Sequence, residues 1–341
     1  MGRILDIFQR LRGTPATDLT LIKDLTDPFA DTPKRIAGLA FEPDQHYVEV
    51  FVESLRLKRS RAFTTTFHGV VYAFFKLTRN GTKSLEIASM TKPGGLAELD
   101  PEHLDRVITV QKKILGATPW RGGTMGVELG LISAKQGDLM TPFLNYIVKF
   151  SDVASSNFLG QAKPFLPLIT DGLQILSTQT NDTEIEIAVD TDIPLAKSLL
   201  CAQIAVPKNK IDLSEISIDP ADMKLLHKGQ PLQEAYCVFS IRRVDSKADY
   251  GEIPEIAKAL AELNGTLVHG LHTAKETLQH FKRIVFLSPD LIEKDKVKIV
   301  DFVAQQVQRL SSLSLSSTDR DSSVHPISLD GLFNNESKSV S

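Results

Sequence analysis

The stretch from Arg61 to Lys92, "RAFTTTFHGVVYAFFKLTRNGTKSLEIASMTK", decides the predicted fold. Residues 62–78 are rich in Phe, Thr and Val, which favour β-strands, and residues 84–91 fit a return strand. Asn80-Gly81 lies between these two runs and is a strong hairpin-turn signal. The sequence therefore predicts a β-hairpin over residues 62–91.

The register of this hairpin depends on the length of its loop. A two-residue Asn-Gly loop would place Phe75 opposite Glu86. A three-residue loop over 79–81 would place Phe75 opposite Leu85 and keep one face of the hairpin apolar. We expect the three-residue loop, with Gly81 in the left-handed conformation of a bulge.

Strand signals dominate the middle of the chain. Residues 124–134 predict a strand, and from 183 to 244 the pattern becomes strand-rich, with "SLLCAQIAV" (198–206) apolar on both faces. Such a segment is typical of a covered, central strand. Because strands and helices do not alternate regularly, a doubly wound parallel fold is disfavoured. We predict an α+β fold with a largely antiparallel β-sheet or sandwich core flanked by helices.

Helices are predicted on both sides of the strand-rich region. Asp100 is a good N-cap, Pro101 fits a first helical turn and Gly116 fits a helix end, which predicts a helix over 101–115. The other helices are predicted at 142–155, 164–177, 253–263, 274–286 and 289–310.

The chain is long enough for two lobes between its two ends. The predicted segments are an N-terminal amphipathic helix and extended arm (1–45), an α+β lobe (46–180), a β-rich lobe with C-terminal helices (181–311) and a disordered, Ser-rich tail (312–341).

Composition excludes few classes of protein. There are 39 basic and 42 acidic residues, a net charge of -3, which argues against a nucleic-acid partner because such proteins present a basic face. The two cysteines, Cys201 and Cys237, form no CxxC pair and fit buried core positions in a reducing cytoplasm. No signal peptide and no apolar run of membrane-spanning length is visible.

Both ends of the chain carry apolar groups that could contact a protein partner. Residues 2–12 have Ile4, Ile7, Phe8 and Leu11 on one face of a predicted helix, which could instead lie on a membrane surface. In the tail, residues 327–333, "ISLDGLF", form an apolar island that could fold on a partner.

One candidate ligand-binding surface surrounds the only tryptophan. Trp120 and Arg121 precede a Gly-rich strand in which Glu128 shares a face with glycines, and glycine within a strand often marks close approach by a ligand or another backbone. The alternative is a helix packed tightly on that face, with Glu128 paired to Arg121 at the rim.

A candidate metal site lies in "VHGLHTAKETLQH", residues 268–280. His269, His272, Glu276 and His280 would share one face of an ideal helix. However, Thr273 and Glu276 match a capping box, which predicts a solvated helix start at Thr273, and one straight helix cannot surround a tetrahedral ion. The solvated start is favoured, with zinc or nickel as the alternative.

No nucleophile-elbow, zinc-protease or phosphate-loop motif occurs in the sequence. The sequence therefore favours a non-catalytic, cytoplasmic binding or adaptor protein that acts through protein–protein contacts and needs no cofactor. One alternative is a metal-assisted hydrolase that uses the 269–280 segment. The other is a peripheral membrane protein that uses residues 2–12.

Overall fold

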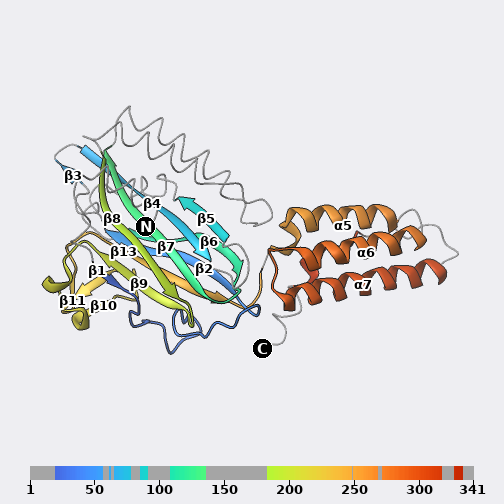
Figure 1. Ribbon diagram of the computed structural model, residues 1–341, viewed down its shortest axis with the longest axis horizontal. Coiled ribbons are helices and arrows are strands. Elements are labelled where there is room, and N and C mark those ends of the chain that lie inside the picture. The colour runs from blue at the N-terminus through green and yellow to red at the C-terminus, as the bar shows by residue number, and fades with distance from the viewer. Residues whose placement is uncertain are drawn as a thin grey trace.

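The computed structural model describes residues 20–56, 61–62, 65–77, 85–90, 108–135, 183–247, 249–267, 271–316 and 326–332. Antiparallel β-sheets form a body at one end of the molecule, and three helices form a bundle at the other end (Figure 1). The predicted α+β class with antiparallel sheets is therefore confirmed.

The first sheet of the body has five strands in the order β1-β9-β13-β2-β6, and every pair in it is antiparallel. β9 lies in the interior of this sheet, between β1 and β13, which agrees with its apolar sequence, and all six of its residues are buried. The strands are β1 (Thr20–Ile22), β2 (Tyr47–Arg56), β6 (Ile108–Pro119), β9 (Leu199–Ile204) and β13 (Tyr236–Val244).

The second sheet contains the hairpin predicted from the opening stretch. β4 pairs with β5 on one side and with β7 on the other, and β8 follows β7. The strands are β3 (Arg61–Ala62), β4 (Thr65–Leu77), β5 (Leu85–Met90), β7 (Thr124–Lys135) and β8 (Thr183–Pro194).

The two sheets share one apolar core, as the layers of a sandwich do. The side chains of β7 alternate, so that Met125, Val127 and Leu129 are fully buried in a cluster that also contains Val50 and Phe239 of the first sheet. This alternation is the period of two that the sequence shows at 124–134.

A second apolar cluster covers the opposite face of the first sheet. Its side chains come from β9 and β13, from the irregular arm before β2, and from the segment between β9 and β13. That segment contains η3 (Lys208–Lys210), η4 (Leu213–Glu215) and a small sheet of β10 (Ile216–Ile218), β11 (Leu225–His227) and β12 (Gln230–Pro231).

The arm is organised by one buried carboxylate, that of Asp27. Its Oδ1 accepts a hydrogen bond from the Phe29 backbone N–H (2.9 Å), and its Oδ2 accepts from Ile36 (2.5 Å) and Ala37 (2.8 Å). Backbone N–H groups that no strand partner reaches are thereby satisfied, which allows the arm to pack closely on the sheet.

Both cysteines are free and buried in the first sheet. Burial disfavours the thiolate and raises the pKa of each thiol, Cys201 and Cys237, to about 12. The prediction that they occupy buried core positions is confirmed.

The bundle consists of one continuous part of the chain. After η5 (Tyr250–Glu252) come α5 (Pro254–Leu267), α6 (Leu271–Leu287) and α7 (Glu293–Ser316), and the short helix η6 (Leu329–Leu332) follows. The three long helices match the three predicted near the C-terminus. Of the helices that the structure describes, none combines the length and the apolar character needed to cross a membrane.

The predicted helix over 101–115 is wrong for the part that the structure describes, where Ile108–Pro119 forms strand β6. The pairing of β6 with β2 shifts register three times, and Gln111 has a positive φ of 38°. These irregularities interrupt the strict alternation of a strand and leave Ile108, Ile114 and Leu115 at a helix-like spacing.

The hairpin is confirmed, but its register differs from the predicted one by two residues. Phe75 lies opposite Ile87, and Leu77 lies opposite Leu85. A shift of two residues keeps every side chain on its face, so the apolar pattern alone could not distinguish the two registers. Gly81 lies outside the described residues.

The predicted boundary at 180/181 does not separate two sheets. β8 follows this boundary and pairs along its length with β7, while β9 and β13 join the sheet that contains β2 and β6. The predicted helices at 2–12, 142–155 and 164–177 lie outside the described residues. In the predicted tail, residues 312–316 continue α7, and residues 326–332 include η6.

Candidate functional site

The three residues of the predicted ligand-binding surface do not form one site. Trp120 is 2% exposed, and its ring packs on that of Phe41 with centroids 5.9 Å apart. Arg121 pairs with Asp44, and its Nη2 donates to the Leu291 carbonyl oxygen (2.8 Å) in the turn between α6 and α7. Trp120 is thus a core residue, and Arg121 joins the body to the bundle.

Glu128 lies buried on β7, on the face that carries Gly126. A Cβ at Gly126 would lie 3.2 Å from Asp192 Oδ1 and 3.3 Å from Lys76 Cβ. The space above this glycine is therefore occupied by side chains of the two neighbouring strands, and Arg121 pairs with Asp44 instead of Glu128.

The structure describes only some of the four candidate metal ligands. Helix α6 begins at Leu271, so Thr273 lies within it and the predicted helix start at Thr273 is wrong. Glu276 and His280 are exposed on this helix, whereas His269 lies outside the described residues. Within the described ranges, no three His, Cys, Asp or Glu side chains gather as a metal site.

A fully buried carboxylate, that of Glu53, links β2 and β13 on the face of the first sheet that points away from the core shared by the two sheets. Glu53 accepts a hydrogen bond from the Ser240 hydroxyl and pairs with Arg242 Nη2 (2.6 Å). The Arg242 guanidinium also lies 4.2 Å from the centre of the Phe51 ring. Its charge neutralises Glu53, and its stacking covers Phe51, which identifies this network as a support of the sheet.

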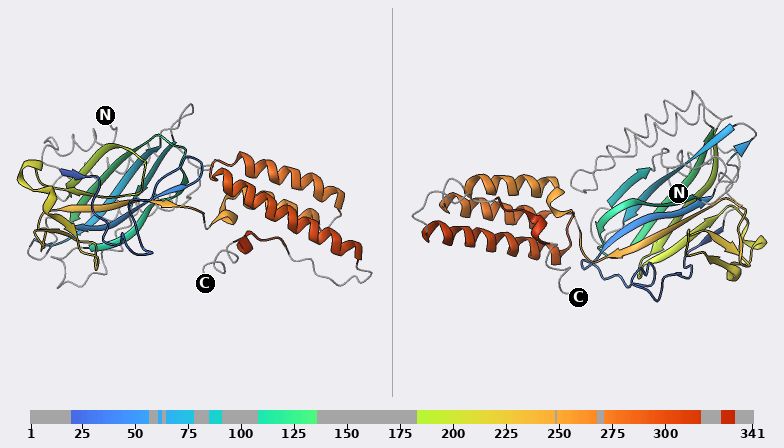
Figure 2. Two further views of the ribbon diagram at one scale, coloured as in Figure 1. Left: turned by 90° about the horizontal axis from the view of Figure 1, so that it is seen from below. Right: turned by 180° about the vertical axis from the view of Figure 1, so that it is seen from behind.

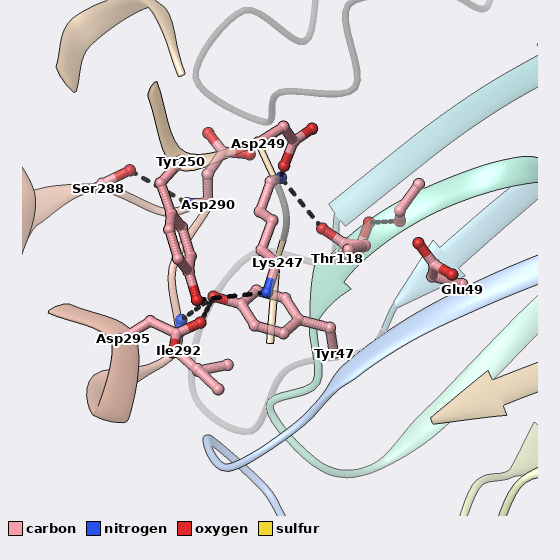
Figure 3. Close-up of polar contacts among 12 residues, drawn as sticks. Tyr47, Glu49, Thr118, Lys247, Asp249, Tyr250, Ser288, Asp290, Ile292 and Asp295 are labelled. Carbon is pink, nitrogen blue, oxygen red and sulfur yellow. Dashed lines mark hydrogen bonds and ion pairs between the residues drawn. The ribbon is translucent and has the colours of Figure 1, made fainter. Parts of the chain in front are cut away.

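The body and the bundle meet in buried polar contacts of Tyr47, Arg121 and Lys247, which we call the joint. Tyr47 and Arg121 contact the turn between α6 and α7 and the first turn of α7, and Lys247 contacts Tyr250. Figure 3 shows the contacts of Tyr47 and Lys247. The Tyr47 hydroxyl donates to Asp295 Oδ2 (2.6 Å) in the first turn of α7, and it accepts from the Ile292 N–H (3.3 Å). One phenol thereby binds both the turn and the helix that follows it.

Burial and the adjacent Asp295 carboxylate raise the pKa of Tyr47 far above its ordinary value. The neutral hydroxyl can donate to Asp295, whereas a phenolate beside this carboxylate would repel it. The proton on Tyr47 is therefore a structural requirement of the joint.

Lys247 completes the joint from the segment that enters the bundle. Its side chain is 1% exposed, and its Nζ donates to the Ala117 carbonyl oxygen of β6 (3.2 Å) and lies 3.8 Å from Asp249 Oδ1. Its backbone N–H donates to the Tyr250 hydroxyl (3.4 Å). The connecting segment is thus fixed to both parts of the molecule.

The bundle holds a peptide from the end of the chain. This tail segment, residues 326–332, lies at the end of the bundle nearest the body (Figure 2), where η6 contacts η5 and α7. Ile327, Leu329 and Leu332 are buried in the same apolar cluster as the helices. The apolar island predicted from the sequence is therefore docked on the protein's own bundle.

Asn264 of α5 recognises the backbone of this tail segment. Its Nδ2 donates to the Ile327 carbonyl oxygen (3.0 Å), and its Oδ1 accepts from the Ile327 N–H (2.9 Å). One side-chain amide therefore satisfies both backbone groups of a buried residue, as a neighbouring β-strand would. We call the surface of η5, α5 and α7 that holds residues 326–332 the tail-binding surface.

The role of Asn264 was not predicted from the sequence, where Asn264-Gly265 indicates a helix end. Helix α5 instead continues to Leu267, because the Asn264 side chain bonds to the tail segment and does not compete for its own backbone. A pairing between residues 63 positions apart leaves no local signal. The tail island was the half of this site that the sequence could reveal.

No family model, curated protein or solved structure matches this chain. A functional assignment therefore depends on contacts within the chain. Among those described above, the tail-binding surface already holds a peptide through contacts to its backbone and its apolar side chains.

Proposed function

We propose that this chain is a non-catalytic binding protein, an adaptor that acts through protein–protein contacts, and that its tail-binding surface recognises a short apolar peptide. The observation that carries this proposal is the paired hydrogen bonding of Asn264 to Ile327, together with the burial of Ile327 and Leu329. Apolar anchors and main-chain hydrogen bonds are the two elements of many peptide-recognition sites.

The remainder of the molecule supports this role by fixing the position of the surface. Tyr47 and Arg121 attach the α6–α7 turn to the sandwich. A peptide bound at the bundle would therefore have a defined orientation relative to the body. The two free, buried thiols support a cytoplasmic location, where thiols stay reduced. A contact through residues 2–12 remains a prediction.

The test is peptide binding by the full-length protein after its own tail segment has been displaced. A tethered peptide has a high effective concentration, so the intact chain would mask binding of an added one. We would replace Ile327 and Leu329 by Asp in the full-length chain, and titrate this variant with a fluorescent peptide of residues 325–334. Saturable one-to-one binding is expected, weakened by a further Asn264→Leu substitution.

Leu287→Asp provides a matched control, because Leu287 is 69% exposed and takes no part in the apolar cluster of the bundle. This variant should keep its tail segment docked and bind little added peptide. A correctly folded Ile327→Asp/Leu329→Asp variant that binds no peptide would contradict the proposal.

A further inference from the structure

The tail segment leaves space unfilled beside one of its residues. Along it, Ile327 and Leu329 are buried, while Ser328 between them is exposed. Ser328 lines a cavity of about 370 Å³ that lies between the tail segment, η5 and α5. This volume is within the range of small-ligand sites, and serine is too short to fill it.

The part of the cavity lining that comes from η5 and the residue before it carries negative charge. Asp249 and Glu252 both line the cavity, and Glu252 is exposed. Asp249 Oδ1 is buried and forms an ion pair with Lys247 Nζ at 3.8 Å, whereas 28% of the Asp249 side chain stays exposed. Lys247 Nζ also donates to the Ala117 carbonyl oxygen of the body, and no Lys or Arg is among the described residues that line the cavity.

A basic side chain at the position of Ser328 would meet both needs of this cavity. The alkyl part of Lys or Arg would cover the apolar wall formed by Ala257, Leu260 and Ala261, and its cationic end would reach the carboxylates. Arg suits the place best, because its several N–H donors can bind two carboxylates at once.

We propose that the external ligand of the tail-binding surface is a peptide in which a Lys or Arg lies between two large apolar residues, at the position that Ser328 occupies in the tail segment. This inference rests on the proposed function of the same surface. The tail segment is then an internal competitor of lower affinity, which occupies the surface until a basic–apolar peptide displaces it.

The experiment uses the full-length Ile327→Asp/Leu329→Asp chain and three peptides of residues 325–334. The peptides differ only at position 328, where they carry Ser, Gln or Arg. Gln controls for side-chain length without charge. The Arg peptide is expected to bind at least five-fold more tightly than the Gln peptide at low salt. This advantage should shrink with added salt, as ion pairs are screened.

Two substitutions identify the source of the advantage. In chains that also carry Glu252→Gln or Asp249→Asn, the preference for Arg over Gln should fall towards unity, while binding of the Ser peptide should change little. An Arg preference that survives both substitutions would overturn the proposed role of this cavity. Equal binding of the Arg and Gln peptides would overturn it as well.

The outcomes separate this inference from the proposed function. If the Ser peptide binds but Arg gives no gain, the surface is a peptide site without the basic preference. If none of the three peptides binds, the proposed function itself fails. A measurement on the otherwise intact chain adds a check independent of added peptide. Ser328→Arg should slow hydrogen exchange of the Ile327 amide relative to Ser328→Gln, and an equal rate would count against the inference.

Discussion

The body and the bundle each bury a cluster of apolar side chains, but they hold their parts in different ways. In the body, each strand is bound to its neighbours by ladders of backbone hydrogen bonds, and polar networks such as Glu53–Arg242 join the strands further. In the bundle, the tail segment is held by side-chain packing and by hydrogen bonds that include those of the Asn264 amide. The tail segment can therefore leave the bundle without breaking the backbone hydrogen bonds of a sheet. This suits the bundle for exchanging one bound peptide for another and the body for structural support.

The largest test of this comparison is to truncate one fully buried phenylalanine in each part. Phe239→Ala in the body and Phe281→Ala in the bundle should each lower the free energy of unfolding by about 3–5 kcal/mol, because each leaves a cavity. Trp120 fluorescence would follow the body and the helical circular dichroism signal would follow the bundle during denaturation. Because the joint couples the two parts, both signals should shift together in both variants. A Phe281→Ala variant in which only the helical signal shifts would show two independent parts.

A smaller effect is expected from removing the coupling itself. Tyr47→Phe leaves the Asp295 carboxylate buried without its donor, and should cost about 2–3 kcal/mol. The two signals should then separate along the denaturation curve. Tyr236→Phe is the matched control, since the Tyr236 hydroxyl accepts from the Leu225 N–H within the body. Coincident curves in Tyr47→Phe would mean that other contacts carry the coupling.

The tail segment sharpens the contrast within the bundle. Leu329 and Leu263 are both buried there, but only Leu263 belongs to a long helix. Leu263→Ala should cost the 2–5 kcal/mol typical of a core leucine, whereas Leu329→Ala should cost only about 1–2 kcal/mol. The loss at Leu329 is limited because the tail segment can leave the surface. Equal losses in the two variants, measured by urea unfolding, would show that the tail segment is an integral part of the core.

The smallest effect concerns alkaline pH. Because the pKa of Tyr47 is raised in the folded protein, its contribution to stability is complete below the ordinary tyrosine pKa of about 10 and falls above it, when the unfolded chain loses the proton first. Stability should drop by about 1 kcal/mol at pH 10.5 from this group. Tyr47→Phe should flatten the decline between pH 9.5 and 10.5, while an unchanged slope would assign the decline to other groups.

The sequence predicted those parts of the fold that have a regular period. The alternation in β7, the two-faced apolar run of β9 and the three C-terminal helices each extend over several turns or residue pairs, and each was found where predicted. Strand β6 was missed because three register shifts and the positive φ of Gln111 interrupt its alternation. Its partner β2 is far away in sequence, so nothing local distinguishes it from a helix.

Less of the candidate site was visible in the sequence. The island that contains Ile327 and Leu329 stands out because it is apolar within a Ser-rich tail. Its receptor Asn264 and the joint residues Tyr47 and Asp295 are ordinary residues of a helix or strand until the chain brings them together. Conversely, Trp120 and the glycine beside Glu128 were conspicuous for reasons of packing.

The position of β2 in the first sheet also means that β2 is synthesised long before one of its two neighbouring strands. β2 lies between β6 and β13, and Arg56 at its end bonds to Gln233, a residue 177 positions later. At roughly 5 to 20 residues per second, β2 leaves the ribosome about 10 to 35 s before the strand that must cover one of its edges. During that interval its alternating valines and its open edge are available to other chains. The nascent protein is therefore expected to need protection by a chaperone until β13 has emerged.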